Sequence, residues 1–244
     1  MNQDIDSIIQ EICLEEPSFR LKNETIRGVN YKCFDSQILN LNDYFKLGLS
    51  YQNNDMIIFE DERYSFKDCY KLSSAFANSL IQKFNVKKGD RVAIASRNYP
   101  EWIYTFIAIT SLGAIAVPLN SWWTGSELEY ALEDCGANIA IVDDKRYESI
   151  KDFAKKKKLE LITIRCNKKN KNNWNSLIRP YVNKEMPNKE IKPDDDATIF
   201  YTSGSTGHPK GVCSTHRSII STLLQWALVA TARAAKDKIQ PDKT

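Results

Sequence analysis

Apolar and polar positions along residues 51–192 follow two alternating periods. Short apolar runs rich in β-favouring residues predict strands over 56–60, 91–95, 114–117, 138–142 and 160–164. Between these runs, apolar residues recur every three to four positions, which predicts helices that bury one face. Strands that alternate with helices are typical of a mostly parallel sheet flanked by helices. The pattern therefore predicts an α/β fold class.

Local capping signals set the predicted helix ends. The run from Ser65 to Asp68 has the Ser-x-x-Asp form of a capping box, which predicts a helix after it. Pro100 predicts the start of a second helix, and Ser126 the N-cap of a third that stops at Gly136. A fourth helix is predicted over 146–157, before a loop rich in lysine and asparagine.

The regular alternation does not extend over the whole chain. Residues 1–50 are predicted as a helical and irregular lead-in whose function cannot be read from the sequence. A first α/β subdomain is predicted over 51–192, and a proline-punctuated loop closes it. Residues 193–244 are predicted to hold a strand, a glycine-rich loop and the helix that follows.

The run 102–119 carries no charged side chain and is nearly long enough to cross a bilayer. Gly113 and Pro118 interrupt it, and the residues between them suit a short buried strand after a helix over about 100–112. We therefore predict a buried helix–strand unit and no transmembrane span.

The composition is that of an ordinary globular chain. Of 244 residues, 42% are hydrophobic and 27% charged, with a net charge of +3, so the chain can bury a sizeable core. Basic residues gather in two short runs, 155–158 and 168–171, without interleaved aromatic residues. This favours solvated helix ends and loops over a nucleic-acid surface.

The cysteines and the first residues bear on the compartment. The six cysteines form no Cys-x-x-Cys pair and only two histidines occur, so neither zinc spacing nor a redox motif is present in the sequence. The first six residues are acidic and lack the basic region and apolar core of a signal peptide. We expect free thiols and a cytoplasmic location, with peripheral membrane contact left open.

The most informative stretch is the run YTSGSTGHPKG, from Tyr201 to Gly211, which holds three glycines, four aliphatic hydroxyls and one lysine. Glycines let several backbone N–H groups turn toward one point, and the hydroxyls and lysine can donate to the same phosphate oxygens. A β-favouring run precedes it, and Thr215 suits the N-cap of an apolar helix to about Ala230. The order strand, loop, helix is the expected setting for a phosphate site.

The run differs from two familiar nucleotide-binding fingerprints. It has neither the Gly-Lys-Ser/Thr spacing of a P-loop nor the first glycine of G-x-G-x-x-G. A solvated Gly/Ser/Thr hairpin or linker is the structural alternative. His216 is one of two histidines but is best explained as a first-turn helix residue, and Trp226 as core packing.

The motif YTSGSTGHPKGV followed by THRS resembles the signature loop of the adenylate-forming (AMP-binding) superfamily, which includes acyl-CoA synthetases, luciferases and peptide-synthetase adenylation domains. The stretches KKGDRVAIASRNYPEWIYTFIAITSLGAIAVPLN and WWTGSELEYALEDCGANIAIVDD resemble its N-terminal domain, and are most similar to the fatty-acyl and related acyl-CoA ligase branch. The resemblance covers most of residues 50–230. It implies the first subdomain of the large N-terminal domain, ending mid-domain.

The resemblance also implies a reaction. A carboxylate attacks the α-phosphorus of Mg-ATP, pyrophosphate leaves, and the acyl-adenylate passes to the thiol of coenzyme A. The residues implied around the β- and γ-phosphates are Thr202, Ser203, Gly204, Ser205, Thr206, Gly207 and Lys210. Lys210 is implied as the catalytic group that stabilises charge on the departing pyrophosphate, and Thr202 as a contact to Mg-ATP. ATP, Mg²⁺ and coenzyme A are the implied cofactors, and an apolar or fatty carboxylic acid the implied substrate.

Members of this superfamily are usually much longer, and their adenine, ribose and acyl-site segments follow the stretch matched here. We therefore expect the N-terminal part of an ATP-dependent acyl-CoA synthetase that is not competent alone. The alternatives are another adenylate-forming enzyme such as a peptide-synthetase adenylation domain, a non-catalytic nucleotide-binding fragment, and an interaction or membrane-associated fragment that uses the apolar run 102–119.

Overall fold

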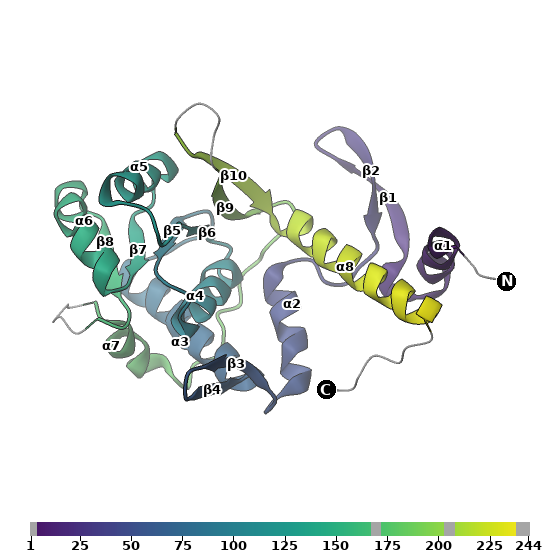
Figure 1. Cartoon of the computed structure of the whole chain (residues 1–244), viewed down its shortest axis with the longest axis horizontal. Helices are drawn as coiled ribbons and strands as arrows, with labels where there is room; N and C mark the ends of the chain where they lie inside the picture. Colours follow the sequence, from purple (N-terminus) through teal and green to yellow (C-terminus); the bar gives the residue numbers. More distant parts are fainter. Residues whose placement is uncertain (1–3, 167–171, 203–207, 238–244) are drawn as a thin grey trace. The chain divides into compact units, whose positions relative to one another are not determined.

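A computed structural model describes residues 4–166, 172–202 and 208–237 (Figure 1). By its internal contacts the chain divides into two compact units, one of Asn40–His216 and one that combines Met1–Leu39 with Arg217–Thr244. The division inferred from the sequence, into 1–50, 51–192 and 193–244, stays a prediction.

The larger unit is built on a mixed sheet. Within the described ranges its strand order is β10-β9-β6-β5-β7-β8. The mutually parallel strands are β5 (Arg91–Ala95), β6 (Ile115–Pro118), β7 (Ile139–Val142), β8 (Glu160–Thr163) and β9 (Asp196–Thr202). At the edge, β10 (Lys210–Thr215) pairs antiparallel with β9. The predicted α/β class with a mostly parallel sheet is confirmed.

Helices cover both faces of this sheet (Figure 1). Alternate strand residues such as Val92 and Ile94 point into a core shared with one set of helices, while Ala93 and Ala95 point into a second core. The first set is α3 (Phe66–Phe84), α4 (Pro100–Ser111) and α7 (Trp174–Ile178), and the second is α5 (Gly125–Cys135) and α6 (Asp144–Lys157). The period of two along buried strands is what lets one sheet serve two cores.

Smaller elements complete this unit. They are α2 (Leu41–Leu47), η2 (Gly48–Tyr51), the antiparallel hairpin of β3 (Asp55–Phe59) and β4 (Glu62–Ser65), and η3 (Arg179–Tyr181).

The capping predictions had mixed outcomes. The capping box of Ser65 and Asp68 is present at the start of α3, and α5 ends at Gly136 with a left-handed φ of 64°. The N-cap of α5 is Thr124, which forms a capping box with Glu127, so the prediction of Ser126 was wrong. Thr124 and Ser126 each stand three residues before a glutamate, so both fit the capping-box pattern. Starting the helix after Thr124 adds a backbone hydrogen bond from the Leu128 N–H to the Thr124 carbonyl, at 3.1 Å.

The uncharged run 102–119 folds as α4 followed by β6, and most of its residues are buried, as predicted. Across the described residues, one helix is long and apolar enough for a bilayer by length and composition, α8 (His216–Asp237). Core helices of globular proteins can have the same length and apolar composition, so these two properties are weak support for a membrane-spanning helix.

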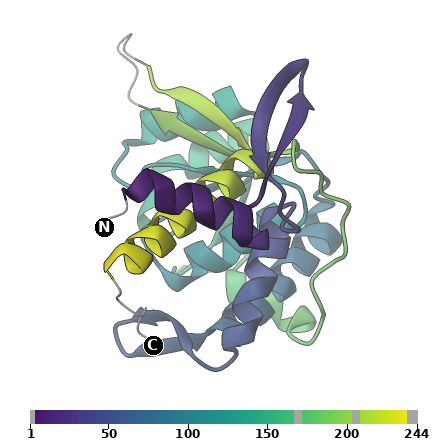
Figure 2. The ribbon, with the colours of Figure 1, turned by 90° about the vertical axis from the view of Figure 1, so that its right-hand side faces the viewer.

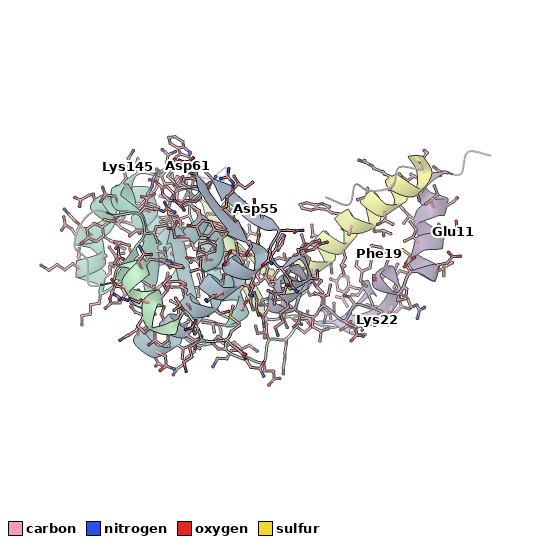
Figure 3. The ribbon with its side chains drawn as sticks, turned by 90° about the horizontal axis from the view of Figure 1, so that it is seen from below. Glu11, Phe19, Lys22, Asp55, Asp61 and Lys145 are labelled. Carbon is pink, nitrogen blue, oxygen red and sulfur yellow. The ribbon has the colours of Figure 1, made fainter. Side chains whose placement is uncertain are left out.

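The smaller unit contains α1 (Ile5–Glu15), η1 (Pro17–Phe19), a hairpin of β1 (Leu21–Ile26) and β2 (Val29–Phe34), and α8 from Arg217 on. Figures 1 and 2 show α1 beside the C-terminal half of α8. Phe19, labelled in Figure 3, packs edge-on against Phe34, and Arg217 makes a two-bonded ion pair with Glu24. One ridge of α8 is buried, formed by Ile220, Leu224, Leu228 and Ala232.

Two expectations for these residues were wrong. The segment 1–50 was predicted as helical and irregular, but it holds the β1–β2 hairpin, whose residues are mostly exposed and so show no apolar alternation. Trp226 was predicted as core, but 69% of its surface is exposed because it lies off the buried ridge of α8.

Candidate functional site

The candidate site lies at the loop end of the β9–β10 hairpin, where β9 ends and β10 begins. Of the seven residues implied around phosphate, Thr202 ends β9 and Lys210 begins β10. The other five, Ser203, Gly204, Ser205, Thr206 and Gly207, lie outside the described residues. The hairpin therefore fixes the two ends of the predicted phosphate loop.

Thr202 and Lys210 are direct cross-strand partners. Because paired residues of an antiparallel ladder project from the same face, their side chains leave the hairpin on one side. Both residues are exposed, and the Thr202 hydroxyl donates to the Lys210 carbonyl at 3.5 Å. The structure thus brings one predicted hydroxyl and the predicted cation to one exposed face at the base of the loop.

The opposite face of the hairpin is packed against the sheet's second core. Tyr201 and Ile199 point to this side. The Tyr201 hydroxyl donates to the Asp134 carboxylate at 2.6 Å and to the Ala131 carbonyl at 3.1 Å. Burial raises the pKa of Tyr201, and the Asp134 carboxylate raises it further, so this phenol stays protonated and acts as a donor.

The predicted order strand, loop, helix was wrong in its last step. A six-residue strand, β10, stands between the loop and α8. The residues Lys-Gly-Val-Cys-Ser-Thr pair along β9 in a continuous ladder up to Ser214, and α8 begins directly after Thr215, the residue predicted as its N-cap. The N-terminus of α8 is therefore separated from the loop by the length of β10.

His216 lies at the far end of β10 from the loop. Its side chain is buried, and its Nδ1 accepts a hydrogen bond from the Leu41 backbone N–H at 3.1 Å. Burial lowers the pKa of His216 to about 4, so the ring is neutral near pH 7. This agrees with a structural role for His216 and not with a catalytic base.

A second feature of this unit is a pocket of about 680 Å³ at the carboxyl ends of the parallel strands. It is lined by four cationic side chains that the sequence did not single out, Arg97, Lys145, Arg146 and Arg165. Arg146 is buried against Asp143, whereas Arg97 lies 3.9 Å above the ring of the exposed Trp122. Ligands commonly bind at the carboxyl edge of a parallel sheet. The position of these residues directly after predicted strands was therefore the sequence signal that could have identified this pocket.

The described residues contain no cluster of three or more His, Cys, Asp or Glu that could hold a metal ion by itself. Mg²⁺ that accompanies a nucleotide needs little from the protein, because phosphate oxygens and water supply most of its octahedral shell. The exposed Thr202 hydroxyl at the base of the loop fits as a single oxygen ligand of that kind.

The sheet, its flanking helices and the edge hairpin with its glycine-rich connection together define an α/β protein of the adenylate-forming class. Residues 49–241 match the family described as AMP-binding enzyme, and the chain belongs to that family. The predicted family is confirmed.

Named relatives agree with this assignment. The chain is 32% identical over 176 residues to a 2-succinylbenzoate–CoA ligase of Bacillus velezensis, covering 70% of this chain and 32% of the relative. It is 28% identical over 169 residues to a 4-coumarate–CoA ligase of Vanilla planifolia, covering 68% and 30%.

Among solved structures, the anthranilate CoA ligase AuaEII in complex with anthranoyl-AMP matches with a TM-score of 0.72 at 26% identity, covering 80% of this chain and 38% of that one. The chain thus spans about a third of the length of the curated relatives it matches.

Proposed function

We propose that this chain is the phosphate-binding, N-terminal part of an AMP-forming acid–thiol ligase. The complete reaction would join a carboxylate to ATP as an acyl-adenylate with release of pyrophosphate, and then transfer the acyl group to the thiol of coenzyme A. The observation that supports it most is the placement of Thr202 and Lys210 opposite each other at the base of the signature loop. Lys210 would stabilise the charge that develops on pyrophosphate as it leaves.

The acid is the least defined part of the proposal. The sequence resemblance implied an apolar or fatty acid, whereas the relatives named above carry the names of 4-coumarate, 2-succinylbenzoate and anthranilate ligases. We propose a carboxylic acid with an apolar or aromatic body, and the assay below compares the two kinds directly.

The test is ATP–pyrophosphate exchange and thioester formation, measured with aromatic and fatty acids on the full reading frame that encodes this chain. Lys210→Ala should slow exchange roughly ten- to hundredfold, because it removes charge-assisted hydrogen bonding that contributes about 1.5–3 kcal/mol. Lys155→Ala, which removes an exposed lysine of α6, is the matched control and should leave the rate unchanged. Residues 1–244 alone should give no exchange, since they span about a third of their relatives.

Two results would contradict the proposal. One is an exchange rate that Lys210→Ala leaves at the level of Lys155→Ala. The other is a full-length protein that binds ATP but forms no adenylate or thioester with any acid of either kind.

A further inference from the structure

Helix α5 contacts both ends of the signature loop, although nothing in the motif itself points to this helix. One contact is to Tyr201 on the strand that enters the loop. The other is to His208 and Pro209, which lead out of the loop toward β10. These residues all belong to the larger unit.

The incoming strand is held by Tyr201. Its hydroxyl is bonded to both the Asp134 carboxylate and the Ala131 carbonyl, one helical turn apart on α5. Its ring packs edge-on against Trp123, with centroids 6.0 Å apart. A hydrogen bond from a phenol to a carboxylate is stronger than one between neutral groups. The bond to Asp134 therefore both stabilises Tyr201 and fixes the orientation of its side chain.

The outgoing strand is held by Tyr130. Its ring stacks on the His208 imidazole with centroids 4.8 Å apart and planes 24° from parallel. Its hydroxyl lies 3.4 Å from the Pro209 carbonyl, at the long end of hydrogen bonding. His208 had received no role from the sequence, and this contact gives it one.

Gly211 allows the two strands to pack this way. It is the cross-strand partner of Tyr201, and a Cβ at this position would lie 2.9 Å from the Ile199 Cγ2 and 3.4 Å from the Tyr201 Cζ. A methyl group at this position would therefore crowd the Ile199 side chain, which packs on the same face of β9 as Tyr201.

We infer that α5 positions the two described ends of the phosphate site, Thr202 and Lys210, with Tyr130 and Asp134 as positioning residues that act through His208, Pro209 and Tyr201. The inference rests on the proposed function, because it assigns these residues to the same phosphate site. They contact His208 and Tyr201, which flank the loop on its two sides. Their effect would be on the geometry with which Thr202 and Lys210 meet the ligand.

The test uses residues 1–244 and Mg-pyrophosphate, followed by NMR of the two histidine side chains and by titration calorimetry. The sequence has only two histidines, so the exposed His208 and the buried His216 can be assigned by single substitution. The ring stacked on His208 should move its imidazole proton signals upfield, and Tyr130→Leu should abolish that shift. Tyr130→Leu should also weaken pyrophosphate binding about tenfold, whereas Tyr130→Phe, which keeps the ring, should restore most of it.

Asp134→Asn provides a second, milder variant that keeps the side-chain size. It should weaken pyrophosphate binding by removing the charged partner of Tyr201. Glu133→Gln is its matched control, because Glu133 is the adjacent residue on α5, carries the same charge, and pairs with Lys157 instead of the hairpin. The control should bind like the wild type.

The outcomes separate this inference from the proposed function. If the wild-type chain does not respond to pyrophosphate at all, the proposed function fails and this inference fails with it. If the wild type binds but Tyr130→Leu and Asp134→Asn, both folded by circular dichroism, bind equally well, the inference alone is overturned. An unshifted His208 signal in the wild type would also overturn it.

Discussion

At the scale of single residues, His216 shows how a polar side chain stabilises the unit that carries the site. Its Nδ1 accepts the Leu41 N–H, and its own backbone N–H donates to the Asp195 carbonyl at 3.0 Å, so it joins α2 to the segment before β9 within the larger unit. Asp195, Lys88 and Asp43 are the charged groups that influence it, with burial the largest effect on its pKa.

This burial predicts a pH dependence of stability. His216 titrates near 6.5 when unfolded and near 4 when folded, so the unfolded chain binds more protons between these values. The contribution of His216 to the free energy of unfolding should be fully present above pH 6.5. It should be lost, by on the order of 3 kcal/mol in total, as the pH drops toward 4. Urea titrations at several pH values measure it.

His216→Asn is the informative variant, because an amide oxygen can accept the Leu41 N–H without titrating. Its unfolding free energy should change less with pH between 6.5 and 5, a window above the ordinary range of carboxylates. An equally steep pH dependence in both proteins would show that His216 is not the group responsible.

At the scale of elements, the β9–β10 hairpin depends on one glycine. Gly211→Ala places a methyl group 2.9 Å from the Ile199 Cγ2, so Ile199 or Tyr201 must shift. Overpacking of this kind typically costs about 1–3 kcal/mol, and we expect that loss in the free energy of unfolding. Val212→Ala, on the exposed face of the same strand, should cost less than about 0.5 kcal/mol. Equal losses in the two variants would contradict the packing described for Gly211.

Elements with a local signal were predictable from sequence, and elements that depend on distant contacts were not. The Ser65 capping box and the buried strands carry their signal within a few neighbouring residues. The β10 strand was missed because its stability comes from pairing with β9 and not from an apolar period. The supports of the loop were missed because Asp134 and Tyr130 lie 67 and 79 positions from their partners, Tyr201 and Pro209.

At the scale of the whole molecule, the chain corresponds to part of the length of its family relatives. It belongs to the AMP-binding enzyme family and spans about a third of its curated relatives, and the part it supplies contains the signature loop. The central claim is that this loop and Lys210 bind the phosphates of a nucleotide. The rest of the proposed function depends on that claim.

The most direct measurement is a crystal structure of residues 1–244 with Mg-pyrophosphate. We predict ligand density at the loop end of the β9–β10 hairpin, with a phosphate oxygen within hydrogen-bond distance of the Lys210 Nζ and an oxygen of the ligand or its Mg²⁺ next to the Thr202 Oγ1. Pyrophosphate bound at another place, with Lys210 and Thr202 directed away from it, would contradict the account.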